Sequence, residues 1–303
     1  VSRYLAAYQL GHVDGLWDPF FAAAPLDKSG AYPGADGGSE SVVTSWLSKD
    51  FPIPDAGLGA AVYALDILAG AIGDRRRWRT MPWMVLLFGF LIIPLGAVSL
   101  TFVLVQPTLI GTLCTLCLVQ AIVTLILIPY SIDEVLATCQ YLRRATRAGE
   151  PFWQTFWRGG PSLSEDQQPV PDLGRPPRAV LLDFLQGGVN YPWTLAAVCA
   201  LALALSASPL LFGTGTPLYW SDHVAGWIAL AIAITALAEV ARAVRFLNVP
   251  VGLWIAASPF WLPGGTAAGT LATCAIGLGI AALSLPRGRR SEETYGARDR
   301  AIV

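Results

Sequence analysis

Seven apolar runs divide this sequence of 303 residues, and they constrain its fold more than any other feature. Most of them approach the roughly 20 residues that an α-helix needs to cross about 30 Å of hydrocarbon. Charged residues make up 14% of the chain, against about 25% in soluble domains. We therefore expect an all-α, polytopic membrane protein with about seven transmembrane helices. The expected helices are 56–72, 81–105, 110–132, 191–212, 223–241, 249–262 and 266–285.

The distribution of basic residues predicts how these helices are oriented. All but three of the 20 Lys and Arg residues lie in regions that fall on one side of the membrane if the helices alternate. Translocated loops are poor in Lys and Arg, so this side is predicted to be cytoplasmic. The other side receives residues 1–55, the 106–109 turn and the 213–222 loop. We expect a multi-pass protein of the cell inner (plasma) membrane, with a further helix upstream of Val1.

Composition divides the chain into five segments. Residues 147–180 are polar and rich in proline, a composition that cannot bury enough apolar area to fold alone. This stretch is predicted to be a cytoplasmic linker between two membrane domains. The full division is a non-cytoplasmic N-terminal segment and loop at 1–55, a helical bundle at 56–146, the linker at 147–180, a second transmembrane domain at 181–286 and a cytoplasmic tail at 287–303.

Two cysteines, Cys114 and Cys117, form a C-x-x-C within an apolar run. Such a pair can form a disulfide, bind a metal, exchange electrons with a small molecule, or pack as two small apolar side chains. A metal site is not predicted, because zinc needs about four ligands and His12 and His223 stand alone on their segments. The other cysteines are isolated in sequence and are predicted to serve packing: Cys139, Cys199 and Cys274. Redox chemistry at the C-x-x-C is therefore the favoured interpretation.

Acidic residues inside the apolar runs need a reason, because a carboxylate in hydrocarbon is costly. Asp66 lies in the middle of a predicted helix, where it either joins a proton path or pairs with a neighbour such as Ser99. Asp133 and Glu134 are expected to end a helix in interfacial ion pairs. Glu239 is expected to pair in the same way, one turn before Arg242.

Residues from about 12 to 142 resemble the vitamin K epoxide reductase family, a membrane helical bundle that reduces quinones or passes disulfide electrons to them. Three features carry the resemblance: an outer loop ending in Ser41-Val-Val-Thr-Ser45, the helix entry Phe51-Pro-Ile-Pro-Asp-Ala-Gly-Leu-Gly59 followed by Tyr63, and the later C-x-x-C. The resemblance implies a quinone substrate, menaquinone or ubiquinone. It implies that Ser45, Asp55 and Tyr63 lie near the quinone head.

The resemblance also implies a role for each sulfur. Cys117 is expected to face the quinone, and Cys114, expected nearer the non-cytoplasmic surface, to exchange with an external dithiol. Family members that relay electrons within one chain have a second cysteine pair in the outer loop, but residues 1–55 contain none, and Ser39 stands near one such position. Ala121 replaces the family's tyrosine one turn past the C-x-x-C. A separate thioredoxin-like partner on the non-cytoplasmic side is therefore expected.

Residues from about 190 to 285 are similar to SPW repeats, through a weak repeat of Ala207-Ser-Pro209 and Ala257-Ser-Pro259. This similarity implies a scaffold without chemistry. It keeps open a competing hypothesis, in which the chain is an inactive structural subunit of a larger membrane complex. Membrane lipid is an expected partner in both cases. The sequence has no phosphate-binding glycine loop, and its basic residues are dispersed, so no nucleic-acid partner is expected.

Overall fold

The computed structural model describes residues 1–21, 38–45, 48, 55–72, 77–160 and 189–288. Helices and connecting turns account for these residues, apart from an isolated antiparallel bridge between Val189 and Ala238. The predicted all-α class is therefore confirmed for this part of the chain. The motif Phe51-Pro-Ile-Pro54, most of the predicted linker and most of the tail lie outside the described residues.

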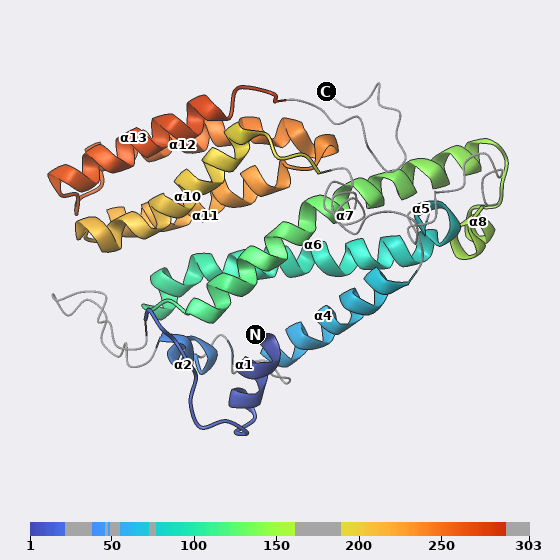
Figure 1. The fold of residues 1–303 in the computed structure, drawn as a ribbon, viewed down its shortest axis with the longest axis horizontal. Coiled ribbons are helices and arrows are strands. Elements are labelled where there is room, and N and C mark those ends of the chain that lie inside the picture. The colour runs from blue at the N-terminus through green and yellow to red at the C-terminus, as the bar shows by residue number, and fades with distance from the viewer. Residues whose placement is uncertain (22–37, 46–47, 49–54, 73–76, 161–188, 289–303) are drawn as a thin grey trace, which may run out of the picture.

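The helices form three layers (Figure 1). The lower layer holds α1 (Ser2–Gln9) and α4 (Asp55–Ala71), and the middle layer holds α6 (Pro82–Val105) and α7 (Thr115–Arg147). The upper layer is built from α10 (Trp193–Phe212), α11 (Leu218–Thr235), α12 (Asn248–Ala257) and α13 (Ala267–Leu283). The short helix α2 (Gly38–Val43) lies at the end of the molecule where α7 begins, and α5 (Arg77–Thr80) and α8 (Phe152–Arg158) lie at the opposite end.

Each of the seven predicted segments contains a helix, with shifted boundaries. The predicted end of the fifth segment at Ala241 is wrong, because α11 stops at Thr235 and residues Glu239–Leu247 form the 3₁₀ helix η4. Within the described residues, three helical stretches are long and apolar enough to cross a membrane: Pro82–Ile110, Thr115–Arg147 and Glu239–Phe260. These helices indicate a membrane protein. The total of seven spans stays a prediction.

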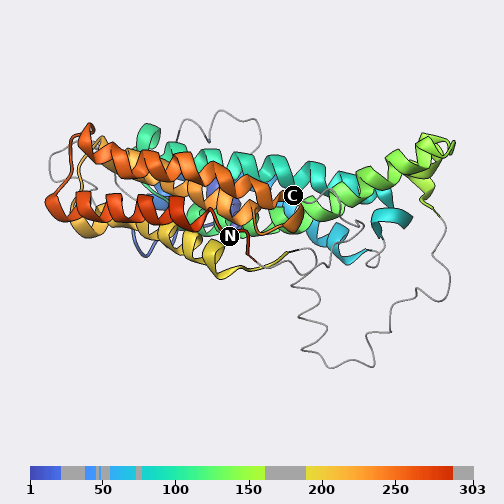
Figure 2. The same cartoon turned by 90° about the horizontal axis from the view of Figure 1, so that it is seen from above.

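Helix α7 is the longest element and differs most from its prediction. It begins at Thr115 rather than Ile110 and continues to Arg147, so its 33 residues extend about 50 Å. That length exceeds the hydrocarbon thickness, and the end of α7 projects past the other long helices (Figure 2). Asp133 and Glu134 are therefore inside a helix, not at its end. The predicted ion pair is confirmed for Glu134, which binds Arg77 at 2.5 Å.

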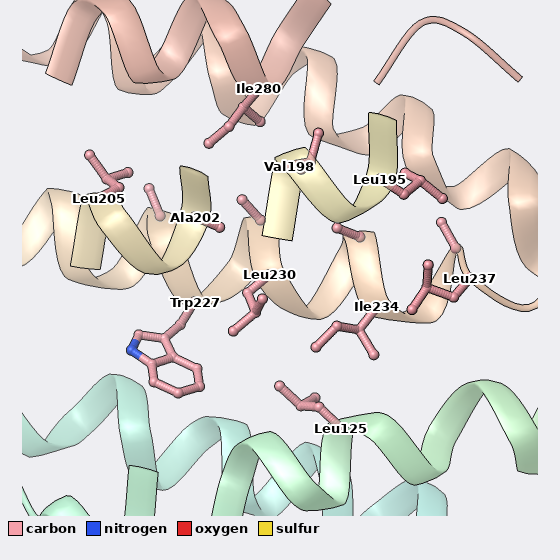
Figure 3. Packing of buried hydrophobic residues seen from close by; sticks show 14 of the residues in the cluster. Leu125, Leu195, Val198, Ala202, Leu205, Trp227, Leu230, Ile234, Leu237 and Ile280 are labelled. Carbon is pink, nitrogen blue, oxygen red and sulfur yellow. The ribbon is translucent and has the colours of Figure 1, made fainter. Parts of the chain in front are cut away.

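One continuous core joins the middle and upper layers. Ala121 and Leu125 of α7 pack with buried residues of α10, α11 and α13, among them Trp227 and Ile280 (Figure 3). Between α6 and α7 the contacts use small residues, since a Cβ at Gly89 would be 2.4 Å from Val135 Cγ2. Close backbone approach of this kind is how helices associate where surrounding lipid is as apolar as the helix surface. The upper layer thus holds one face of α7.

A buried histidine also ties the two layers together. Pro107 has no N–H to donate to the carbonyl of Val103, four residues before it. His223 of α11 lies 3.1 Å from that carbonyl through Nε2 and is 1% exposed. Because the carbonyl only accepts, Nε2 is the nitrogen that carries the proton. His223 therefore supplies a donor at the end of α6, where the proline cannot.

The upper layer consists of two helix pairs with matching Ser-Pro ends. Ser208 donates to Leu205 O at 2.9 Å, and Ser258 donates to Ile255 O at 3.0 Å, so both hydroxyls bond the carbonyl three residues back. The turns that follow meet, because Gly215 N donates to Gly264 O at 2.8 Å. The weak sequence repeat thus corresponds to a repeated local geometry.

Replacing Gly277 with valine is expected to separate α12 from α13. A Cβ at Gly277 would lie 2.5 Å from Ala256 N and 2.6 Å from Gly252 O, both backbone atoms that cannot turn aside. Overpacking of this kind costs about 1–3 kcal/mol in the free energy of unfolding. Denaturant titration in mixed micelles measures the loss. Ala275→Val on the exposed face of the same helix is the matched control, and an equal loss in both variants would contradict this packing.

Candidate redox site

The two sulfurs of the C-x-x-C form a disulfide at the first turn of α7. Cys114 and Cys117 have Cα atoms 5.2 Å apart, as a cross-link of one helical turn requires. Gly111 has φ +81°, a left-handed conformation that ends the preceding π-helix η1 (Gln106–Ile110). Cys114 is the N-cap of α7, and its Sγ accepts a hydrogen bond from Cys117 N at 3.0 Å. A thiolate formed at Cys114 would therefore lie at the positive end of a helix.

The two cysteines differ in exposure. Cys114 is 0% exposed, whereas Cys117 is half-buried. The cover comes from α1 and α2, whose buried side chains pack in one cluster with Cys114: Leu5, Val42 and Val43. These short elements dock on the start of α7 because each contributes apolar residues to that cluster. An external dithiol therefore reaches Cys114 only after α1 or α2 moves.

A buried carboxylate fastens this cover to the redox helix. Asp18 accepts hydrogen bonds from Thr115 Oγ1 at 2.5 Å and Ser39 Oγ at 2.6 Å. It also accepts from the backbone N–H groups of Phe20, Phe21, Ser39 and Thr115. Burial alone would raise the pKa of Asp18, but hydrogen bonds from Ser39 and Thr115 to the charged form prevail and lower the pKa below its ordinary value. Sequence reasoning missed this residue, since its partners are distant in the chain.

Gln106 is a second site residue that sequence reasoning missed. Its Oε1 accepts a hydrogen bond from Cys114 N at 3.1 Å, and the side chain is 0% exposed. Its Nε2 has no hydrogen-bond partner among the described residues. The π-helix η1 begins at this residue, and such local widenings of a helix often mark functional sites. The signal in the sequence was an amide within an apolar run, eight residues before the first cysteine.

Asp55, predicted to lie near a quinone head, begins α4 beside the covering helices. Its Oδ1 accepts from Gln9 Nε2 at 2.6 Å, from Ser48 Oγ at 2.7 Å and from Ala56 N at 2.8 Å. Ala56 packs against the cluster that surrounds Cys114. The structure therefore brings Asp55 to the edge of the cysteine site, with its carboxylate held by α1 and by Ser48.

The hydroxyl groups of the other two predicted quinone residues have hydrogen-bond partners away from the sulfur atoms. Ser45 follows α2, and its hydroxyl donates back to Val42 O at 2.7 Å. Tyr63 hydrogen-bonds Thr124, which is seven residues past Cys117 on α7 and thus two turns deeper in the bundle. Residues 46–47 and 49–54, which connect Ser45 to Asp55 on either side of Ser48, lie outside the described residues.

The two departures from the family pattern also have places in the structure. Ser39 binds Asp18 and is therefore close to Thr115, the residue after Cys114. Ala121 is 1% exposed and belongs to the core shared with the upper layer. The position of the family's tyrosine therefore faces α10 and α11, where a large polar side chain would have to displace their packing.

The remaining cysteines stand alone. Cys199 and Cys274 are partly buried in helices, as predicted for packing, but Cys139 is exposed, so its predicted packing role is wrong. No group of three or more His, Cys, Asp or Glu side chains able to hold a metal occurs among the described residues. A cavity of about 520 Å³ lies between α11 and α12, bordered by apolar residues such as Val224, Ile228 and Val251. None of the predicted site residues lines it.

Residues 1–132 match the sequence model of the Vitamin K epoxide reductase family. The match covers less than half of the 303 residues and includes α1, α2, α4, α6 and both cysteines of the disulfide. The predicted resemblance to this family is thereby confirmed. The match covers residues 1–132, whereas the predicted range was about 12–142. No curated protein and no solved structure gives a significant match to the chain. The resemblance to SPW repeats gains no support and stays a prediction.

Proposed function

We propose that this chain is an integral membrane thiol–disulfide oxidoreductase of the vitamin K epoxide reductase type, which passes electrons from an external dithiol to a membrane quinone. The observation that carries the proposal is the Cys114–Cys117 disulfide at the first turn of an apolar helix, within the residues that match this redox family. The proposed setting is the cell inner membrane, with the disulfide near the non-cytoplasmic face and a thioredoxin-like protein as the electron donor. The quinone is menaquinone or ubiquinone.

The proposed reaction has two half-reactions, and each transfers two electrons. A thiolate of the partner attacks Cys114 Sγ, which forms a mixed disulfide and releases Cys117 as a thiolate. The second partner thiol resolves the mixed disulfide, so the partner leaves oxidised and the C-x-x-C is left as a dithiol. Cys117 then passes two electrons to the quinone, which takes up two protons and becomes a quinol, and the Cys114–Cys117 disulfide is restored.

The surrounding residues supply the conditions for these steps. The N-terminus of α7 stabilises a thiolate, and the unpartnered Nε2 of Gln106 is a buried donor on the residue that already binds Cys114. Asp55 and Tyr63 are proposed to border the quinone head, with Ser45 as a further contact. Because Cys114 is fully covered, the first exchange requires α1 and α2 to open.

The test follows the redox state of the two thiols in the purified full chain. After reduction with a dithiol, both cysteines are expected to react with a thiol label. Addition of a short-chain ubiquinone or menaquinone analogue before labelling is expected to restore protection, with one quinol formed per disulfide. If the reduced pair stays labelled at the same level after either quinone is added, the proposal is wrong.

A non-catalytic subunit of a larger membrane complex is the second candidate. The observation that favours it is the complete burial of Cys114 together with the absence of cysteines from residues 1–55. In that case the disulfide is structural, and its reduction should lower stability without any electron transfer to quinone. The labelling experiment separates the two functions, since only the enzyme reoxidises with quinone.

A further inference from the structure

A row of polar groups follows one face of α4 and meets α7 at Gln120 and Thr124, starting one turn past Cys117. On α4, Gly59 lies against Gln120 of α7, since a Cβ there would be 3.8 Å from Gln120 Nε2. Tyr63, one turn further along α4, hydrogen-bonds Thr124. Oε1 of Gln120 has no partner among the described residues. The row thus begins with an amide one turn past Cys117 and continues with a pair of hydroxyls.

Asp66 continues the same face of α4. Gly59, Tyr63 and Asp66 are spaced i, i+4 and i+7, which places them on one side of a helix. Asp66 is 7% exposed, whereas its neighbours Leu65 and Ile67 are 51% and 72% exposed. Its two carboxylate oxygens have no hydrogen-bond partner among the described residues, and the alternative pairing with Ser99 is not formed. A buried carboxyl group without a partner is costly, so its presence calls for a function.

The row reaches the far end of the bundle through an ion pair. One turn past Asp66, the carbonyl of Ala69 accepts a hydrogen bond from Arg77 Nη1 at 2.8 Å. Arg77 also holds Glu134 of α7 through Nε at 2.5 Å and Nη2 at 2.7 Å. From Cys117 to Glu134, the row therefore extends about 26 Å along α7, close to the thickness of the hydrocarbon layer.

The interior of the bundle gives Asp66 few other charged neighbours. Helix α6 contains no ionisable side chain from Pro82 to Val105. On α7 the ionisable groups between Thr124 and the end of the row are Tyr130, which bonds Tyr191, then Asp133 and the Arg77-bound Glu134. On α4, Asp66 is three residues from Tyr63 and three from Ala69, so each step is about 4.5 Å of helix rise, within reach of a bridging water molecule.

From this arrangement we propose that Asp66 and its row conduct protons from the Arg77–Glu134 end of the bundle to the quinone beside Cys117. The inference rests on the proposed quinone reduction. Oxidation of the external dithiol releases two electrons and two protons, and quinol formation consumes two of each. Because the consumed protons enter from the far end and the thiol protons leave at the cysteine end, each quinol moves two positive charges across the membrane.

The experiment uses the full chain in sealed liposomes that contain a quinone analogue and a pH dye. Dithiothreitol would cross the membrane, so a reduced thioredoxin-like protein is added outside, where it drives only molecules whose C-x-x-C faces outward. The expected result is quinol formation with loss of about two protons from the lumen per quinol. A protonophore should abolish the accompanying change in lumenal pH. Absence of quinol overturns the proposed function and this inference together. Quinol formation with an unchanged lumenal pH overturns this inference alone.

Substitutions of Asp66 test its part in the path. Asp66→Asn is expected to slow quinol formation by about tenfold or more and to remove lumenal proton uptake, while Asp66→Glu restores both. Ser99→Ala, which removes the alternative partner, is expected to leave both unchanged. The thiol-labelling pattern of each variant reports whether the cysteine site is intact. Unchanged lumenal proton uptake in Asp66→Asn would show that protons take another route.

Discussion

Replacing Cys117 with serine is expected to abolish quinol formation, a loss of about a thousandfold or more, because no disulfide remains to accept the partner's electrons and no second sulfur remains to reduce the quinone. The same substitution leaves Cys114 as a lone thiol. If Cys114 is the sulfur that meets the partner, its thiolate attacks the disulfide of an oxidised thioredoxin-like partner, forms a mixed disulfide and releases the partner's second sulfur as a thiolate. Quinol absorbance measures the first effect, and non-reducing gel electrophoresis with mass spectrometry measures the second.

The reciprocal variant tests the order of the two sulfurs. Cys114→Ser is expected to lose activity equally, but to trap no partner. A mixed disulfide that forms only in Cys114→Ser would show that the two sulfurs have the reverse roles. Cys117 is the more exposed of the two cysteines, so this result is the specific alternative that the pair of variants tests. Cys139→Ser is the matched control, since this exposed cysteine lies on the same helix and outside the site. Its activity should equal that of the unmodified chain.

Replacing Asp18 with asparagine is expected to expose the redox pair. Hydrogen bonds to a charged group contribute about 1.5–3 kcal/mol each, and asparagine keeps the shape of Asp18 without its charge. Loss of even one such bond shifts the opening of the cover by about tenfold or more, so Cys114 should react with a thiol label at least tenfold faster after reduction. Stopped-flow labelling of the reduced protein measures this rate.

The charge of Asp18 has a second effect in the same direction. A carboxylate next to the first turn of α7 opposes formation of a thiolate at Cys114, so Asp18→Asn should lower the pKa of that thiol. The pH profile of labelling should therefore move to lower pH, which opening of the cover alone would not cause. Asp14→Asn, four residues earlier at an exposed position, is the control. Equal labelling rates in the Asp14 and Asp18 variants would refute the fastening role.

Acid should release the same contact. The pKa of Asp18 is lower in the folded protein than the unfolded value of about 3.9, so its contribution to stability is present above that value. As pH falls through the folded pKa, the carboxylate is protonated and the contribution is lost. Labelling of Cys114 relative to a free thiol at the same pH should therefore increase below about pH 4 in the unmodified chain, and this increase should be absent in Asp18→Asn.

The helices were predictable because apolar length is a local property of the sequence. The start of α7 was not, since it depends on Gly111 in a left-handed conformation and on Asp18, which approaches from far along the chain. The C-x-x-C was found for the same local reason, but its burial was not, because α1 and α2 bring the cover from distant segments. Gln106 was missed because an isolated amide becomes a site residue only when η1 turns it toward Cys114.

The long helix α7 is held on adjoining faces, by the upper-layer core at Ala121 and Leu125 and by α4 and α6 at Thr124 and Val135. A helix fixed in this way cannot slide or turn to present its first residue to a visiting protein. In the proposed catalytic cycle the disulfide is therefore the stationary part, and the N-terminal segments are the moving part. Selection for a particular electron donor should accordingly act on α1, α2 and the loop that carries Asp18, more than on the residues around the sulfurs.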